Sequence, residues 1–256
     1  MRRISLFHHS FQYASGVDTG MKRVSNQDEI ISCPQHGFFA VSDGMGGLSC
    51  GGETSAMIAK VLPGLICQAN IELKKDHCPE RAAELLGEQV RMISDNIYEK
   101  INRHGEFVCG ATLCGVWLTG RHAVFINIGD SRGYWLGYRE KNIRQITNDH
   151  NMAAELVASG KLSRVQAGHH SSSTMLIRFM GMDSPAMPET FIQELKTGDR
   201  ILLCSDGLYG MVDDSRLAQL LRVGNNPDLV IKHLIDEANH AGGKDNISAV
   251  YIEILP

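Results

Sequence analysis

An α+β fold is predicted by this sequence of 256 residues, with an antiparallel sheet system covered by pairs of helices. Two pairs of amphipathic helices lie far apart in the chain, and runs of strands precede, separate and follow them. Successive strands in the middle of the chain have short connections, which is typical of antiparallel hairpins rather than βαβ units. The sequence contains no low-complexity linker, so we expect one domain that spans residues 1–256.

The first helix pair is predicted at residues 53–70, where Pro63 should disturb the helix, and at residues 79–102. In the second of these helices, apolar residues recur at three-and-four spacing along one face. The second pair is predicted at residues 213–223 and at residues 226–243, with Asn226 as the N-cap of the last helix.

Strands are predicted where short apolar runs are bounded by Gly, Asp or Asn. A flexible loop is expected at residues 167–175, because this segment is rich in Ser and His and has no apolar periodicity. The predicted strands are residues 11–17, 37–43, 111–120, 122–130, 132–138, 189–195, 200–206 and 247–255.

Composition argues against several classes of protein. The net charge is −4 and no dense Lys/Arg run occurs, so nucleic acid is not an expected partner. The 7 cysteines are odd in number and scattered, which predicts reduced, mostly buried thiols rather than a disulfide framework or a thiolate zinc site. The N-terminus lacks the apolar segment of a signal peptide, and no apolar run approaches the roughly 20 residues of a membrane span. We therefore expect a cytoplasmic protein.

Aspartates follow or precede buried strands at five places. A Ser-Asp-Gly sequence follows a strand twice, at Asp43 and at Asp206, and further aspartates are Asp28, Asp130 and Asp245. Any one of them alone is readily explained as a turn former. Together they suggest convergence on one cleft, where carboxylates repel one another unless a cation lies between them. Oxygen ligands without His or Cys favour Mg²⁺ or Mn²⁺ over zinc.

Two such ions can stabilise the attacking and leaving oxygens of a phosphoester hydrolysis. Gly44 is a further candidate ligand, through a carbonyl that no side chain obstructs. Arg23, five residues before Asp28, could bind phosphate oxygens through its bidentate fork. The alternative for Arg23 is a solvated surface charge, which is what its spacing alone favours.

The sequence resembles the metal-dependent Ser/Thr protein phosphatases of the protein phosphatase 2C family, in their compact bacterial form. The motifs that carry the resemblance occur in the order of the family and cover about residues 13–254. They are "RVSNQDE", "VSDGMGG", "GATLCGVWLTGRHAVFINIGDSRGYW", "TNDH", "LIRFMG", "GDRILLCSDGLYGMV" and "GGKDNIS". The resemblance implies a four-layer αββα sandwich, with two central antiparallel sheets flanked by helix pairs. It also implies two Mn²⁺ or Mg²⁺ ions, and a third position in bacterial members.

The resemblance also implies roles for individual residues. Arg23, Asp43 and Asp206 match catalytic positions, and Arg23 matches the arginine that contacts phosphate. The nucleophile would be a water held by the metals, so no covalent enzyme intermediate is expected. Among the implied metal ligands, Asp43 would bridge two ions and Gly44 would offer its carbonyl to one of them. Asp206 and Asp245 would hold the first ion and Asp28 the second. Asp130 and Asp206 would together hold the third.

Two residues depart from the pattern of the family. Gln27 stands where a Glu often supports the second metal, and its neutral amide is a weaker partner. Met45 stands where eukaryotic relatives have a His that protonates the leaving group, so the general acid is not identified. His150 is one alternative, although lone histidines are more often structural. The segment that follows, about residues 150–180, matches a mobile flap beside the cleft.

The leading hypothesis is a phosphatase that acts on phosphoserine and phosphothreonine in proteins and opposes a bacterial Ser/Thr kinase. We expect a monomer without a membrane span. One alternative is a non-catalytic phosphoprotein-binding regulator, and the retained aspartates argue against it. Another is a phosphoesterase that acts on small phosphoesters or nucleic acid. Turnover of a phosphopeptide compared with nucleotides would separate these classes.

Overall fold

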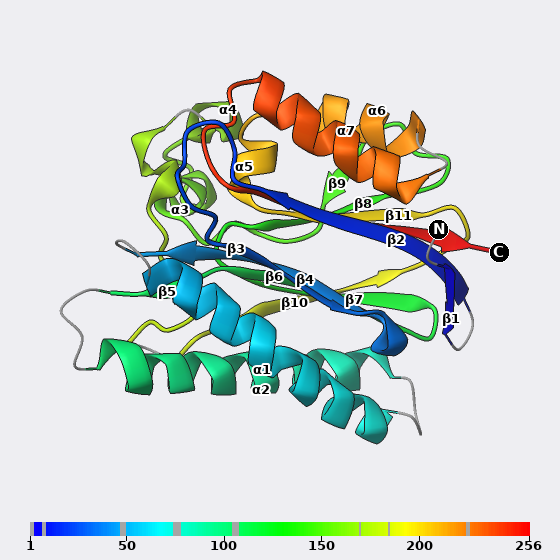
Figure 1. The fold of residues 1–256 in the computed structure, drawn as a ribbon, viewed down its shortest axis with the longest axis horizontal. Coiled ribbons are helices and arrows are strands. Elements are labelled where there is room, and N and C mark those ends of the chain that lie inside the picture. Colours follow the sequence, from blue (N-terminus) through cyan, green and yellow to red (C-terminus); the bar gives the residue numbers. More distant parts are fainter. Residues whose placement is uncertain are drawn as a thin grey trace.

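The computed structural model describes residues 3–6, 9–46, 50–73, 78–103, 108–168, 170–183, 185–223 and 226–256. Two antiparallel sheets lie face to face, and one helix pair covers the outer face of each sheet (Figure 1). The resulting order of layers is helices, sheet, sheet, helices, so the predicted αββα sandwich is confirmed.

The first sheet, which we call sheet 1, contains both ends of the chain. Its last strand lies between the N-terminal hairpin and the strand that leads to Asp206. Strands β8, β11, β12 and β2 confirm the predicted strands in this sheet, whereas β1 and β9 were not predicted. Sheet 1 has the order β1 (Arg3–Leu6), β2 (His9–Asp18), β12 (Ile247–Leu255), β11 (Arg200–Cys204), β8 (Arg132–Leu136) and β9 (Arg144–Gln145).

The second sheet, sheet 2, contains the first Ser-Asp-Gly motif at the end of β4. Strand β3 was not predicted, because it begins with two acidic residues next to a polar loop and lacks clear alternation. Sheet 2 has the order β10 (Glu189–Glu194), β7 (His122–Ile128), β6 (Leu113–Thr119), β4 (Phe38–Met45) and β3 (Asp28–Cys33), with the short β5 (Gly110–Ala111) paired to the end of β4.

The four predicted helices are present. Helices α1 (Cys50–Leu73) and α2 (Pro79–Ile97) pack on sheet 2, and α6 (Asp214–Val223) and α7 (Pro227–His240) pack on sheet 1. The expected disturbance at Pro63 is wrong, because α1 continues through this residue. Helix α2 ends earlier than predicted and is followed by a π-helical turn, η2 (Tyr98–Asn102).

Helix α1 also requires a correction to the expectation about membrane spans. By length and composition alone it is long and apolar enough to cross a membrane. A core helix of a water-soluble protein meets the same criterion, and Ile58, Leu62 and Ile66 of α1 are fully buried against sheet 2. Its apolar character is therefore not specific to a membrane protein.

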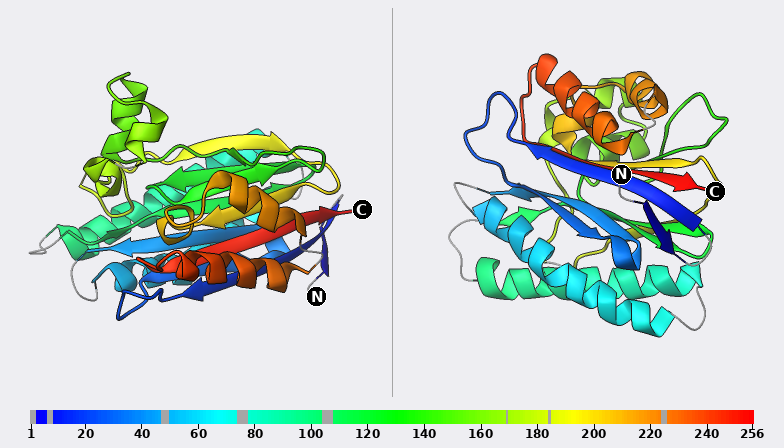
Figure 2. Two further views of the ribbon diagram at one scale, coloured as in Figure 1. Left: turned by 90° about the horizontal axis from the view of Figure 1, so that it is seen from above. Right: turned by 45° about the vertical axis from the view of Figure 1, so that its right-hand side comes forward.

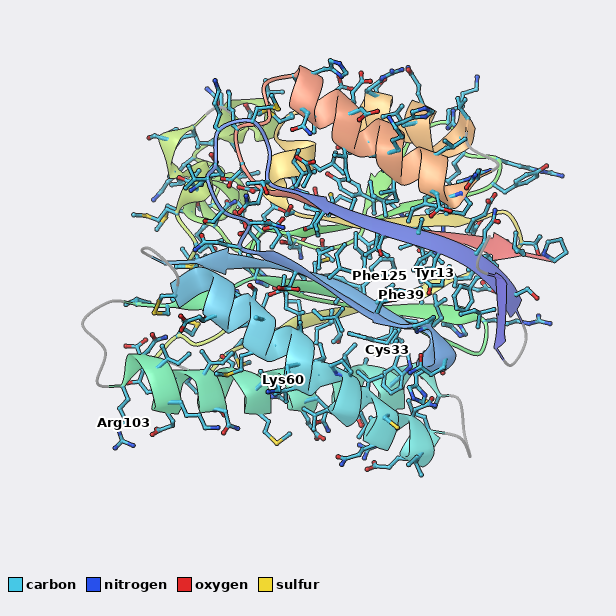
Figure 3. All side chains as sticks on the ribbon, viewed as in Figure 1. Tyr13, Cys33, Phe39, Lys60, Arg103 and Phe125 are labelled. Atoms are coloured by element: carbon cyan, nitrogen blue, oxygen red, sulfur yellow. A yellow bond between two sulfur atoms is a disulfide. The ribbon has the colours of Figure 1, made fainter. Side chains whose placement is uncertain are left out.

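The core is built as three apolar layers, one between the sheets and one beneath each helix pair. Between the sheets, aromatic rings from both sides interdigitate. Tyr13 of β2, Phe39 of β4 and Phe125 of β7 point into this central layer (Figure 3). The rings of Phe11 of sheet 1 and Phe39 of sheet 2 meet edge to face at a centroid distance of 5.8 Å, which is a favourable aromatic geometry.

A disulfide joins Cys50 to Cys109, which contradicts the prediction that the cysteines are reduced. Sequence spacing gave no signal because the two residues are 59 positions apart and are brought together only by the packing of α1 against β5. Their Cα atoms are 5.7 Å apart, within the normal range for a disulfide. The prediction of small buried thiols is correct for Cys33, Cys114 and Cys204.

The segment that matches the flap stands out from one end of the sandwich (Figure 2). It contains α3 (Met152–Ala158), α4 (Arg164–Ala167) and a 3-10 turn, η3 (Ser171–Thr174). Within the predicted flexible loop at residues 167–175, the turn η3 is capped by His170, which accepts from Ser172 N at 3.2 Å. His169 lies outside the described residues.

Candidate metal centre

The five predicted aspartates come from the same end of the sandwich. The loop at residues 19–27, the short helix α5 (Asp206–Tyr209) and β5 lie together there, beside α3 and α4 (Figure 1). Asp28 and Asp43 are directly opposite each other in the β3–β4 register. Asp206 is the first residue of α5, and Asp245 closely precedes β12.

The serine of the first Ser-Asp-Gly motif anchors the end of β4. Ser42 Oγ donates to the Thr112 carbonyl at 2.7 Å, and Thr112 N donates to the Asp43 carbonyl at 2.8 Å. Thr112 Oγ1 accepts from Asp43 N at 3.0 Å and shares a 2.7 Å hydrogen bond with Ser131 Oγ. Thr112 therefore fixes the backbone of Asp43 from both sides.

The serine of the second motif has a different role. Ser205 Oγ donates to Asp28 Oδ2 at 2.7 Å and accepts from Ser248 N at 2.9 Å. The glycine of this motif has a steric role, since a Cβ on Gly207 would lie 2.0 Å from the Asn246 carbonyl oxygen. The two similar motifs thus place their aspartates by different sets of contacts.

Gly44 is required by close packing. A Cβ on Gly44 would lie 2.3 Å from the Gly51 carbonyl oxygen, and a Cβ on Gly51 would lie 2.7 Å from the Gly44 carbonyl oxygen. The two glycines allow the start of α1 to contact the end of β4. The sequence predicted glycine at position 44 only for its unobstructed carbonyl. The structure adds a second requirement, since any side chain at this position would clash with the start of α1.

Arg23 is paired with Asp245 at this end of the molecule. Its Nη2 lies 2.7 Å from Asp245 Oδ2, and the two side chains are 53% and 33% exposed. The hydrogen bond and the charge of Asp245 raise the pKa of Arg23, and the negative charges of Asp43 and Asp206 act in the same direction. Arg23 is thus oriented toward the aspartates rather than being an isolated surface charge.

Asn246 holds the loop that carries Arg23, and the sequence reasoning missed it. Its Nδ2 donates to the carbonyls of Thr19 and Ser25 at 3.0 and 2.9 Å. Its Oδ1 accepts from Gln27 N at 2.8 Å. The sequence carried no local signal for this role, because the groups that Asn246 contacts are 219 to 227 residues away in the chain.

Asp130 lies in a turn supported by His150. Gly129 has φ +107°, and its N–H donates to His150 Nδ1 at 3.2 Å while its carbonyl accepts from His150 N at 2.9 Å. His150 is 3% exposed, and burial lowers its pKa. The Asp130 carbonyl accepts from Tyr209 Oη at 2.9 Å. These contacts agree with the structural interpretation of His150.

The buried carboxyls are electrostatically unfavourable to one another. Burial raises the pKa of Asp43 well above its usual range, and the charges of Asp28, Asp206, Asp130 and Asp245 raise it further. Burial, followed by the charges of Asp130 and Asp245, raises the pKa of Asp206 to about 8. Burial also raises the pKa of Asp28 and of Asp130 to about 6.

The residues present fit a hard divalent cation. Oδ1 of Asp28 and Oδ1 of Asp206 are buried without a hydrogen-bond partner, which is costly unless another ligand satisfies them. A divalent cation would satisfy both oxygens and relieve the mutual repulsion. Within the described ranges, no three His, Cys, Asp or Glu side chains already surround a single point. We therefore expect the carboxylates, including Asp245 in its pair with Arg23, to adjust on metal binding.

The two departures from the family pattern also lie at this centre. The Gln27 carbonyl accepts from Gly44 N at 3.1 Å and from Ser55 Oγ at 2.7 Å, so it links the loop, β4 and α1. Its side chain lies near Gly52 of α1. Met45 is the last residue of β4 and pairs with Gly110. Neither residue supplies an acid for a leaving group.

Comparison with known proteins supports the resemblance. Residues 21–228 match the family described as Protein phosphatase 2C. The serine/threonine phosphatase stp of Listeria monocytogenes is 30% identical over 224 residues, which cover 83% of this chain and 82% of that protein. The crystal structure of the serine/threonine phosphatase Stp1 from Staphylococcus aureus superposes with a TM-score of 0.85 at 26% identity, covering 100% of both chains. The catalytic domain of the phosphatase PstP in complex with 2 manganese ions superposes with a TM-score of 0.74 at 26% identity, covering 96% of this chain and 99% of that one.

Proposed function

The chain belongs to the protein phosphatase 2C family, and from this premise we propose how its own residues carry out hydrolysis of phosphoserine and phosphothreonine in proteins. It is a metal-dependent Ser/Thr phosphatase that uses Mn²⁺ or Mg²⁺. When bound, the ions supply an activated water and neutralise negative charge on the phosphate. The remaining chemistry depends on where the aspartates and Arg23 lie.

Asp43 is the central carboxylate of the proposed site. Its charge interacts with all four of the other aspartates, and strand pairing places it opposite Asp28. We assign Asp43 as the carboxylate that would hold the metal at the centre of the site, with the Gly44 carbonyl beside it. The remaining ligands in this assignment are Asp28, Asp130, Asp206 and Asp245.

Arg23 is proposed to bind the phosphate of the substrate. Its guanidinium is half exposed and lies at the edge of the aspartate cluster, so an incoming phosphate can reach it without unfolding the loop. A guanidinium fork binds phosphate oxygens in a bidentate geometry that a lysine cannot provide. Binding of substrate would give Arg23 a phosphate as its partner in place of Asp245.

The observation that carries the proposal is the pair of buried, unpartnered oxygens on Asp28 and Asp206. A regulator that only bound phosphoproteins would gain nothing from burying such oxygens together, because each one destabilises the fold without a cation. The net charge of −4 gives no support to nucleic acid as the substrate.

We further propose that the protein is a cytoplasmic, single-domain monomer without a membrane span, and that it opposes a Ser/Thr kinase in a signalling pathway. The burial of Ile58, Leu62 and Ile66 supports α1 as a core helix. The continuous apolar layer between the sheets, formed by strands from both ends of the chain, supports a single domain.

The test is phosphate release from a phosphothreonine peptide, with Mn²⁺ titrated in after chelation. Wild type should show metal-dependent release, and Asp206→Asn should lower it by a factor on the order of 100 or more, because it removes a ligand charge. Asp228→Asn, an exposed position in the first turn of α7, serves as the matched control and should retain activity. Near-normal turnover by Asp206→Asn would overturn the site, and faster turnover of nucleotides than of the peptide would overturn the substrate class.

A further inference from the structure

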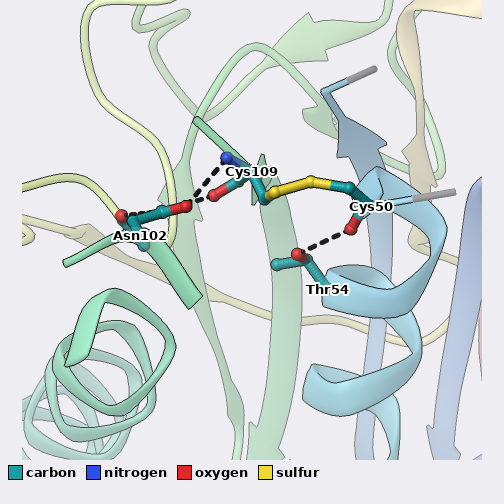
Figure 4. The surroundings of a disulfide bond; sticks show 5 residues. Cys50, Thr54, Asn102 and Cys109 are labelled. Atoms are coloured by element: carbon teal, nitrogen blue, oxygen red, sulfur yellow. Dashed lines mark hydrogen bonds between the residues drawn. A yellow bond between two sulfur atoms is a disulfide. The ribbon is translucent and has the colours of Figure 1, made fainter. Parts of the chain in front are cut away.

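The disulfide between Cys50 and Cys109 lies directly beside the proposed metal centre. Cys50 is the first residue of α1, and its carbonyl accepts from Thr54 Oγ1 at 2.9 Å (Figure 4). Cys109 immediately precedes β5. The disulfide therefore fastens the start of α1 to the strand that pairs with the end of β4.

Only a few residues of the chain separate the disulfide from the proposed metal centre. In β5, Gly110 pairs with Met45 and Ala111 pairs with Gly44. The next residue, Thr112, holds the backbone of Asp43 on both sides.

Gly46, the residue directly after β4, lies against the disulfide itself. A Cβ on Gly46 would lie 3.2 Å from Cys50 Sγ and 3.4 Å from the Cys109 Cα. The segment that runs from Asp43 through Gly44 to Gly46 is therefore packed, at Gly46, against both cysteines of the disulfide.

The same bridge is connected to the base of the flap. Asn102 donates through Nδ2 to the carbonyls of Cys109 and Gly181 at 2.6 and 2.5 Å, and its Oδ1 accepts from Cys109 N at 2.9 Å (Figure 4). Ala111 and Met180 exchange backbone hydrogen bonds. Cys109 therefore lies between the metal centre and the point where the flap returns to the sandwich.

We propose that Cys50 and Cys109 form a redox modification site that controls the affinity of the adjacent centre for Mn²⁺. The oxidised form holds Gly44 and Asp43 in place for the metal. The reduced form releases α1 from β5 and weakens metal binding. This inference rests on the proposed metal centre, but not on which phosphoprotein is the substrate.

The chemistry is a reversible two-electron reaction. In the oxidising direction with hydrogen peroxide, the two thiols lose two hydrogens, the S–S bond forms, and the peroxide is reduced to two waters. In the reducing direction, a dithiol attacks Cys50, which is the more exposed of the two, and Cys109 leaves as a thiolate that takes up a proton. The attacking dithiol ends as a disulfide.

The other cysteines allow a matched control. Cys67 is exposed on α1, outside the metal centre and not bridged, so Cys67→Ser should leave the redox response unchanged. Cys33, Cys114 and Cys204 are buried in the core and protected from solvent oxidants.

The experiment measures binding of Mn²⁺ alone by calorimetry and, separately, phosphatase activity, for wild type after treatment with hydrogen peroxide or with a dithiol. The oxidised protein should bind the tightest Mn²⁺ ion about tenfold more strongly than the reduced protein, the size typical of losing support for a metal ligand. Cys50→Ser and Cys109→Ser should bind as the reduced protein does under both treatments. Mass spectrometry of peptides should show Cys50 linked to Cys109 after peroxide.

Equal Mn²⁺ affinity in oxidised and reduced wild type would overturn the proposal even if one of the variants failed to fold, because that comparison needs no substitution. A redox response that survives in Cys50→Ser would also overturn it. If the oxidised and the reduced protein bind Mn²⁺ with different affinities but neither releases phosphate, the redox inference stands and the proposed phosphatase function fails.

Discussion

Ser205 and Asp28 are 177 residues apart in the chain, yet the Ser205 hydroxyl donates to Asp28 Oδ2 at 2.7 Å. The bond connects the two sheets at the end where the aspartates gather, since Asp28 begins β3 of sheet 2 and Ser205 follows β11 of sheet 1. It satisfies one oxygen of Asp28 and leaves Oδ1 unpartnered. Ser205 therefore orients Asp28 as a potential metal ligand without occupying both of its oxygens.

Ser205→Ala should weaken Mn²⁺ binding about tenfold, because Asp28 loses the group that orients it. The variant should also lose about 1–3 kcal/mol of stability, since Ser248 N would be left without its buried acceptor. Calorimetric Mn²⁺ titration and urea unfolding measure the two effects. Ser215→Ala, at an exposed position on α6, is the control. Unchanged Mn²⁺ affinity would show that Ser205 has only a structural role.

Arg23→Ala should raise KM for a phosphopeptide about tenfold or more and change kcat less, because a charge-assisted contact to the phosphate is lost. The same substitution removes the partner of Asp245, so Mn²⁺ binding in the absence of substrate should not weaken. Lys22→Ala removes a neighbouring exposed positive charge and should leave KM unchanged. An equal KM for wild type and Arg23→Ala would mean that Arg23 is only a surface charge.

Much of the fold could be predicted because its elements are encoded locally. Helix α2 has its apolar residues along one face, and α7 is capped by Asn226, which accepts from Asp228 N as the sequence predicted. Strands that are buried on both faces, such as β6, read as continuous apolar runs. Strand β3 was missed because its pairing with β4, rather than its own pattern, makes it a strand.

The candidate site could be predicted only in part. Asp43 and Asp206 follow apolar strands, so their positions were readable from the sequence. The contacts that orient them come from residues distant in the chain, such as Thr112 for Asp43 and Asn246 for the loop of Arg23. The Cys50–Cys109 bridge has the same origin, because no local pattern records which strand α1 will contact.

Asn246→Ala should lower stability by about 3 kcal/mol and raise KM as Arg23→Ala does, because three backbone groups of the loop at residues 19–27 lose a shared partner. Asn246→Asp retains the acceptor for Gln27 N but places a buried carboxylate oxygen against the carbonyls of Thr19 and Ser25, so it should lower stability at least as much as Asn246→Ala. Urea unfolding and phosphopeptide kinetics test both variants. A loss of stability without a change in KM would show that the loop does not position Arg23.

The stability of the metal-free protein should fall as the pH rises from 5.5 to 8.5. Unfolded aspartates have a pKa of about 3.9, whereas the folded protein raises the pKa of Asp28 and Asp130 to about 6 and that of Asp206 to about 8. The folded state therefore binds more protons than the unfolded state across this window, and its stabilisation is lost as the pH passes through the folded values. Mn²⁺ favours the ionised carboxylates, so it should raise Tm more at pH 8.5 than at pH 5.5.

Asp206→Asn isolates the largest of these contributions, because the amide occupies a similar volume and cannot ionise. In chelator at pH 8.5 the variant should be more stable than wild type, and an effect on the order of 2 kcal/mol corresponds to roughly 4–8 °C in Tm. The difference should shrink at pH 5.5, where Asp206 of the wild type is protonated. The comparison also removes the influence of His150, whose lowered pKa makes stability rise with pH in both proteins. A metal-free wild type at least as stable as Asp206→Asn at pH 8.5 would show that the buried carboxylates do not repel one another as their placement implies.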